Sequence, residues 1–197
     1  MILSGCTPKL ITANFTKTGM SKQPKGLIVH IAEAPQLSSI FNWFNNPDQQ
    51  VRNAKTGEME HISASAHFAI GKDGEVWQFV DTDHQAHAQG GGNSDYFSVE
   101  HVGYAGDELT DSQIKALAWL FRYLSDQYGF PLNVADQPGQ FGLGYHSMGA
   151  DWGHPQCPGR KIIDQRQQVV DLARAAAERE HLAELRSASS RASLTRE

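Results

Sequence analysis

The sequence predicts one α/β domain with a mixed central β-sheet flanked by helices, and three local patterns support this prediction. The apolar run Gly26–Ile31 is rich in β-branched residues and has the length of a buried strand. The turn Lys72-Asp73-Gly74 separates two apolar segments, which is typical of a β-hairpin. A helix with its own start signal begins at Thr110. Strands interleaved with helices favour a sheet that helices cover.

The remaining strands and the first helix follow from apolar spacing. Ser39–Asn45 is predicted to be a short helix that ends before Pro47 and turns three apolar side chains inward: Ile40, Phe41 and Phe44. The two hairpin strands are expected over Ala66–Ile70 and Glu75–Val80, and a fourth strand over Phe97–Tyr104.

The second helix is the most clearly marked element. Thr110 and Gln113 form a capping box, in which the hydroxyl and the amide satisfy the first free backbone N–H groups. Gly129 and Pro131 end the helix. Between these signals, apolar residues recur at helical spacing: Ile114, Leu117, Ala118, Phe121 and Leu124.

Composition excludes several classes of protein. The chain has 197 residues, 40% of them hydrophobic, and a net charge of −5 from 17 basic and 22 acidic residues. We expect one domain with a core of its own and no membrane span, because no apolar run approaches the roughly 20 residues a spanning helix needs. The mild acidity argues against nucleic-acid binding. Two cysteines cannot build a disulfide framework, whereas nine histidines are many for this length.

We expect an N-terminal extension over residues 1–24, a catalytic domain over 25–175, and a C-terminal helical extension with a flexible tail over 176–197. The helix is predicted from Arg160 to about Leu185. The start, Met1–Cys6, resembles a lipoprotein processing site but lacks a basic region and an apolar stretch of roughly 7–15 residues. We therefore expect synthesis in the cytoplasm without a classical signal peptide.

Three places in the sequence carry candidate chemistry. His30 lies near the end of an apolar strand, where a histidine is more often structural than a ligand. Glu100 lies among buried apolar neighbours, which is costly unless the carboxylate is paired or used. Cys157 follows two histidines, His146 and His154. A thiolate and imidazoles suit Zn²⁺, and three such ligands with one open position are the catalytic pattern.

Six segments occur in an order that is specific to one enzyme family: Gly26–His30, Ser65–Val80, Ala86–Asn93, Phe97–Glu100, Leu109–Gln113 and His146–Gly159. With these residue types in this order, the chain resembles the zinc-dependent N-acetylmuramoyl-L-alanine amidases shared by phage endolysins and peptidoglycan recognition proteins. The resemblance covers roughly Lys25 to Ala173.

The resemblance implies a role for each site residue. It makes His30, His146 and Cys157 the ligands of a Zn²⁺ cofactor. It places Glu100 on the family's general acid/base glutamate. It also places His154 near the position where family members often have a donor beside the scissile carbonyl.

The chain departs from the family pattern in two places. The gap between His146 and Cys157 is long, so the insertion Ala150–Gly153 leaves His154 as an alternative ligand. We expect His146, because a ligand at His154 would leave only two residues before the cysteine. The second departure is Ala66, where some phage members carry a catalytic tyrosine. Its absence puts more of the proton transfer on Glu100.

The resemblance implies a peptidoglycan hydrolase that cuts the amide bond between N-acetylmuramic acid and L-alanine. We expect an endolysin-type, bacteriolytic enzyme that acts as a monomer on the cell wall or in the periplasm after release. The loop His84–Asn93 is expected to line the groove, with His87 and Asn93 contacting the substrate. Trp152 is expected either to stack on sugar or to cover the metal.

Other functions remain open at this point. A recognition module could bind peptidoglycan without cutting it, although such relatives lose the cysteine that this chain keeps at Cys157. A cytoplasmic amidase that recycles soluble muropeptides, or a toxin delivered by a secretion machine, fits the missing signal peptide equally well. A purely structural zinc site would need a fourth protein ligand, and no residue in the matching segments supplies one.

Overall fold

A computed structural model describes residues 1–53 and 55–194, with side chains up to residue 187. Its centre is a six-stranded sheet in the order β1-β7-β6-β9-β3-β10. The strands are β1 (Thr7–Pro8), β7 (Val76–Gln78), β6 (Phe68–Ile70), β9 (Tyr96–His101), β3 (Gly26–Ile31) and β10 (Gly142–Tyr145). Within the described chain β6 and β7 pair antiparallel, and the other neighbours in this sheet pair parallel. The predicted mixed sheet is confirmed.

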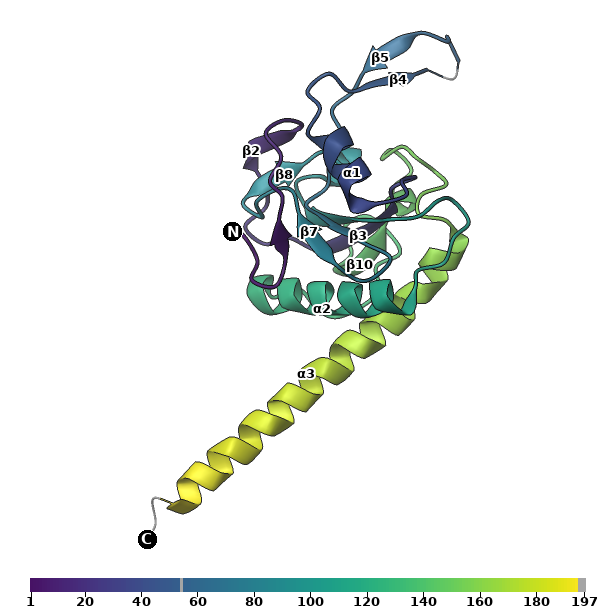
Figure 1. Ribbon diagram of the computed structural model, residues 1–197. Helices are drawn as coiled ribbons and strands as arrows, with labels where there is room; N and C mark the ends of the chain where they lie inside the picture. The colour runs from purple at the N-terminus through teal and green to yellow at the C-terminus, as the bar shows by residue number, and fades with distance from the viewer. Residues whose placement is uncertain (54, 195–197) are drawn as a thin grey trace.

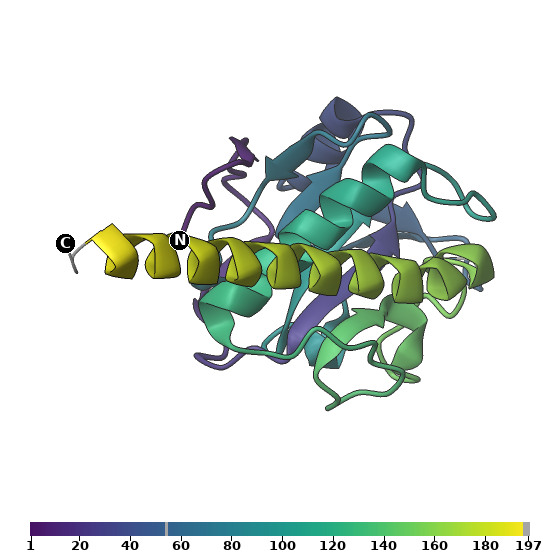
Figure 2. The same ribbon diagram turned by 90° about the horizontal axis from the view of Figure 1, so that it is seen from below.

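Helices cover both faces of this sheet (Figure 1). Helix α2 (Asp111–Tyr128) and the start of α3 (Arg160–Leu194) lie on one face, and α1 (Leu37–Phe44) lies on the other. Seen from below, α3 crosses α2 (Figure 2). Alternate residues of β3 point to opposite faces. Leu27, Val29 and Ile31 therefore enter the core beneath α2 and α3, while Ile28 and His30 face the α1 side.

The end signals of α2 act as predicted. The Thr110 hydroxyl accepts from the Gln113 backbone N–H, and the Gln113 side chain accepts from the Thr110 N–H. Gly129 ends the helix in the left-handed region at φ 76°, a conformation that glycine adopts without steric cost. Four residues of its buried face are inaccessible to solvent: Leu117, Leu120, Phe121 and Leu124.

Several elements differ from the predicted bounds. Helix α1 begins at Leu37, with Ile40 and Phe44 buried. Strand β9 ends at His101, because the chain then makes an isolated bridge between Gly103 and Ala34 and turns away. Two small antiparallel pairs were not predicted: β2 (Phe15–Gly19) with β8 (His84–Ala86), and β4 (Gln50–Arg52) with β5 (Met59–His61). The β4–β5 hairpin projects beyond α1 (Figure 1).

The two ends of the chain behave differently. The N-terminal segment belongs to the fold, because β1 extends the sheet and Leu3 is buried in its core. Helix α3 starts against the domain and then projects from it (Figure 1). It continues to Leu194, beyond the predicted end near Leu185, because no glycine or proline interrupts a run of good helix formers. The rest of the predicted tail, residues 195–197, lies outside the described residues.

No helix in the described part of the chain is both long and apolar enough to cross a membrane.

Candidate metal and catalytic site

Two neighbouring strands bring the first site residues together. His30 on β3 is in direct register with Glu100 on β9. Both line a cavity of about 740 Å³ on the α1 side of the sheet. His30 is only 2% exposed. The register of two parallel strands therefore sets an imidazole beside a carboxyl group.

The third strand supplies the second histidine. Tyr145 on β10 pairs with Val29 on β3. The next residues of the two chain segments, His146 and His30, therefore lie at the same level. The ring centroids of His30 and His146 are 4.5 Å apart. His146 begins a short 3₁₀ helix, η2 (His146–Met148), and is 3% exposed. Parallel pairing thus places the two imidazoles side by side.

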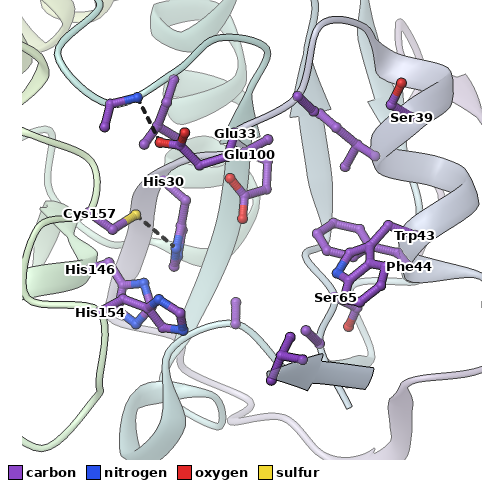
Figure 3. A pocket seen from close by; sticks show the side chains of 18 of the residues that line it. His30, Glu33, Ser39, Trp43, Phe44, Ser65, Glu100, His146, His154 and Cys157 are labelled. Carbon is purple, nitrogen blue, oxygen red and sulfur yellow. Dashed lines mark hydrogen bonds between the residues drawn. The ribbon is translucent and has the colours of Figure 1, made fainter. Parts of the chain in front are cut away.

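Cys157 reaches the same point from the following loop. Its carbonyl accepts a hydrogen bond from the Ser147 N–H at 2.9 Å, which ties the loop to η2. Its Sγ lies 3.9 Å from His30 Nδ1 (Figure 3). One ligand atom from each of His30, His146 and Cys157 lies within 4.8 Å of the others. The structure therefore gathers the trio expected from the sequence, and His154 is outside it.

The chemistry of these three donors fits a zinc ion. Bonds of about 2.3 Å to sulfur and about 2.0 Å to nitrogen at a tetrahedral angle separate the two atoms by roughly 3.5 Å. The observed 3.9 Å between Cys157 Sγ and His30 Nδ1 is close to this value. Burial lowers the pKa of both histidines, and for His30 the neighbouring His146 adds to the effect. Both imidazoles are therefore neutral at pH 7, which is the form that binds metals.

The thiol of Cys157 must lose its proton to bind a metal ion. Burial raises its pKa, and the charge of Glu100 raises it further. Without a cation this sulfur therefore stays protonated and is a poor nucleophile. A cation among these donors would stabilise the thiolate. The arrangement is that of a metal ligand and differs from that of a catalytic cysteine.

Glu100 is a buried carboxyl group with a raised pKa. Burial raises the pKa of this carboxyl to about 8, and the nearby Glu33 carboxylate contributes. Its Oε2 is buried and has no hydrogen-bond partner among the described residues. The side chain faces the cavity (Figure 3). A carboxyl group with such a pKa can both take up and release a proton near neutral pH.

The cavity has a polar end and an apolar end. The metal trio, Glu100 and His154 form the polar end, and Trp43 and Phe44 of α1 form an apolar wall (Figure 3). Ile40 of α1 also lines the cavity. His154 is exposed, with its ring centroid 5.3 Å from that of His146. Its backbone has φ 48°, in the left-handed region that a non-glycine residue seldom adopts. This side chain lies beside the trio and is open to a ligand.

The three residues predicted to bind substrate lie in different environments. His87 lines the cavity, and its ring nitrogens are held by the hydroxyls of Thr16 at 2.8 Å and Ser63 at 2.7 Å. The Asn93 side chain accepts from two backbone N–H groups of its own loop. Trp152 is buried and packs edge-on against Tyr96. Neither Asn93 nor Trp152 lines the cavity.

Two polar residues near the centre were missed in the sequence. Glu33 lines the cavity and accepts from the Ala105 N–H at 2.6 Å, with its backbone at φ 50°. Gln89 is buried against His30. Glu33 lies in a loop without a periodic pattern, so no local signal marks it, whereas Gln89 lies within the loop His84–Asn93 that was expected to line the groove. The start of the Gly90–Gly92 run was the nearest hint for Gln89.

A family model described as N-acetylmuramoyl-L-alanine amidase matches residues 20–160, which include the metal trio and Glu100. No curated protein sequence matches.

Three solved structures illustrate the shared fold. The Staphylococcus aureus hydrolase AmiA, in complex with its ligand, has a TM-score of 0.63 at 17% identity, over 87% of this chain and 83% of that one. AmpD has a TM-score of 0.63 at 19% identity, over 86% and 96%. The endolysine N-acetylmuramoyl-L-alanine amidase LysCS from Clostridium intestinale URNW has a TM-score of 0.55 at 16% identity, over 86% and 97%.

Proposed function

The chain belongs to the N-acetylmuramoyl-L-alanine amidase family, and from this premise we propose a zinc-dependent hydrolysis in which Glu100 is the general acid and base. The observation that carries the proposal is the meeting of a His, His, Cys trio with a buried carboxyl group in one cavity. His30, His146 and Cys157 would hold the ion.

The reaction needs help at two atoms. An amide carbon is a poor electrophile and neutral water is a poor nucleophile. When bound, zinc supplies Lewis acidity that polarises a carbonyl oxygen and lowers the pKa of water to about 7. Three protein ligands leave a fourth position for such chemistry, as in catalytic zinc sites.

Glu100 moves the proton. Its carboxylate takes a proton from the water that attacks the lactyl carbonyl of N-acetylmuramic acid. It then returns this proton to the departing nitrogen of L-alanine, so the amide bond breaks without releasing an amide anion. The pKa of about 8 makes Glu100 a stronger base than an ordinary glutamate. Its free Oε2 faces the cavity from which the water would come.

His154 and the loops complete the site in this proposal. The exposed His154 ring beside His146 is placed to donate a hydrogen bond to the carbonyl oxygen as negative charge develops on it. His87 contacts the substrate from the cavity wall. Asn93 and Trp152 contribute by holding the loop of Gln89 and Gly92 in place next to the cavity.

We extend the proposal to biology. The enzyme would be made in the cytoplasm and, after release, would act as a monomer on the peptidoglycan of the wall, as an endolysin does. Resemblance to phage endolysins supports this assignment. Lysis of whole cells from outside would favour it, whereas activity confined to soluble muropeptides would favour recycling.

The test is a digest of purified peptidoglycan with and without a chelator, followed by mass spectrometry. Free stem peptides that begin with L-alanine, intact glycan strands and loss of activity on chelation are expected. Activity should return when zinc is added back to the chelated protein without any other metal. A metal-loaded protein that binds the wall and releases nothing would replace the enzyme with a recognition module.

A further inference from the structure

We propose that Gln89 is a positioning residue that fixes the tautomer of His30 and so directs Nδ1 of this imidazole toward the metal position. The inference rests on the proposed function, because it concerns a ligand of the proposed zinc ion. It concerns a residue that lies on a loop 59 positions from its partner in the sequence.

The hydrogen bonds of Gln89 settle which way its amide points. The side chain is 1% exposed. Its Nε2 donates to two backbone carbonyls, Gly92 O at 3.3 Å and Tyr96 O at 3.2 Å. Since a carbonyl only accepts, the NH₂ group must face these two oxygens. The Oε1 atom must then face His30.

The tautomer of His30 follows from this orientation. Gln89 Oε1 lies 3.2 Å from His30 Nε2 and can only accept. The hydrogen therefore resides on Nε2, and Nδ1 keeps its lone pair. That lone pair lies on the side of Cys157 Sγ, 3.9 Å away. Metal-binding histidines typically donate their second ring N–H to such an acceptor.

His146 is set in the same way by a different acceptor. Its Nε2 lies 3.1 Å from the carbonyl oxygen of Trp152, so it also carries the hydrogen and leaves Nδ1 free. The residues before Cys157 that lengthen the family spacing thus supply an acceptor. Both imidazoles present the same nitrogen to the centre of the trio.

Trp152 connects the loop that contains Gln89 to the loop that follows His146. Its ring packs so closely on Gly92 and Gly149 that an added Cβ would lie 2.6 Å and 2.2 Å from ring atoms. Gly92 belongs to the loop that receives the Gln89 amide, and Gly149 to the loop that follows His146. Asn93 adds a hydrogen bond from the Gln89 N–H to its Oδ1 at 2.7 Å. These packing and polar contacts keep Gln89 against His30.

A matched control separates this role from simple loop stability. Gln78 is another fully buried glutamine, and its Nε2 donates to the carbonyls of Met1 and Val80, each at 3.0 Å. Its Oε1 accepts from the Leu3 N–H, and among the described residues the Gln78 side chain has no hydrogen bond to a histidine. Gln78→Leu and Gln89→Leu therefore remove comparable hydrogen bonds, but only the second removes the acceptor of His30.

The experiment measures zinc affinity by competition with a chromophoric chelator, and histidine tautomers by ¹⁵N NMR of the metal-free protein. Gln89→Leu should weaken zinc binding about 10–100-fold and let His30 exchange tautomers. Gln78→Leu should leave both readouts unchanged, with a similar loss of thermal stability. Gln89→Glu keeps an acceptor toward His30 but loses the donor to the Gly92 and Tyr96 carbonyls, so its zinc affinity should lie between those of Gln89→Leu and the unsubstituted protein.

Several results would overturn the inference. These are an Nδ1–H tautomer of His30 in the unsubstituted protein, or equal zinc affinities for Gln89→Leu and Gln78→Leu. If Gln89→Leu fails to fold, Gln89→Val is a second variant whose side chain has no acceptor, and the same comparison applies. A chain that binds no zinc would refute the proposed function, yet the NMR tautomer of His30 would still test the role of Gln89.

Discussion

At the scale of a single residue, burial of the Glu100 carboxyl group disfavours its charged form and makes that form more basic. A carboxylate in this environment loses much of its hydration, which is why its pKa rises to about 8. Its Oε2 finds no compensating donor among the described residues. The carboxyl group nevertheless faces a cavity, beside three side chains that could hold a metal ion. The same desolvation makes it an effective base.

Glu100→Gln should lower the turnover of peptidoglycan roughly 10²–10⁴-fold, because the amide cannot exchange a proton with water. Zinc content should stay at one per chain, since Glu100 is outside the trio. Release of stem peptides and atomic absorption measure the two quantities. A variant that retained near-normal turnover would remove Glu100 from the mechanism.

His154→Ala should reduce kcat by about 10²–10³-fold, the usual effect of deleting one donor to a developing oxyanion. Zinc should remain bound, because His154 lies outside the trio. His146→Ala is the matched comparison and should lose zinc. The reverse pattern, with zinc lost in His154→Ala and kept in His146→Ala, would exchange the assignments of these two histidines.

At the scale of elements, His67 joins neighbouring strands by hydrogen bonds although it lies outside the metal trio. His67 precedes β6 and is completely buried. Its Nδ1 lies 3.0 Å from the Ser98 hydroxyl of β9, and its Nε2 lies 3.0 Å from the His84 carbonyl of β8. It therefore links three strands as a neutral side chain. Burial lowers its pKa to about 4.

This pKa makes stability depend on pH. Below about pH 6.5 the unfolded chain protonates His67, whereas the folded chain does so only near pH 4. The contribution of His67 is therefore complete above pH 6.5 and is lost as the pH falls toward 4. His67→Gln should reduce the slope of unfolding free energy against pH by about 1.4 kcal/mol per pH unit in this window. Urea titrations of the metal-free proteins at several pH values measure this slope. Equal slopes for the unsubstituted protein and His67→Gln would contradict the prediction.

Elements that carry their own signals could be predicted from the sequence. Strand β3, the β6–β7 hairpin and α2 have apolar periodicity or caps that depend on nearby residues. Strand β10 was missed, because Gly142 and Gly144 disfavour a strand locally. Its stability comes from parallel pairing with β3, more than a hundred residues earlier. The small strands β2 and β8 likewise depend on a distant partner.

The same division applies to the site. His30, His146, Cys157 and Glu100 could be proposed because their side-chain chemistry is distinctive and their order resembles a family. Glu33 and Gln89 are ordinary polar residues in loops. Their importance arises from contacts that only the folded chain creates. The positions of Asn93 and Trp152 outside the cavity follow from packing that the sequence does not display.

At the scale of the whole molecule, the metal trio joins distant parts of the chain. His30 comes from the third strand, and His146 and Cys157 come from the segment between β10 and α3. An ion bound there would stabilise the folded state only, because the unfolded chain does not hold these donors together. Metal binding at the trio would therefore be coupled to folding across most of the sequence.

Saturating zinc should raise the melting temperature relative to the chelated protein. At 1,000 times the dissociation constant the expected stabilisation is about 4 kcal/mol. Scanning calorimetry with zinc and with chelator measures the difference. Cys157→Ser provides the control, in which the difference should shrink. An identical melting temperature in both conditions would be incompatible with a zinc site in this trio.

The projecting helix α3 determines how the enzyme can be attached to other objects. The cavity lies on the α1 side of the sheet. Helix α3 packs on the opposite side and then projects away from the domain (Figure 1). Glu180 pairs with Arg122 of α2, and beyond this ion pair the helix projects away from the domain (Figure 1). A bead, a surface or a fused protein joined at this end is held at a distance from the cavity mouth. Immobilised enzyme should therefore retain access to polymeric substrate, with α3 acting as a built-in spacer arm.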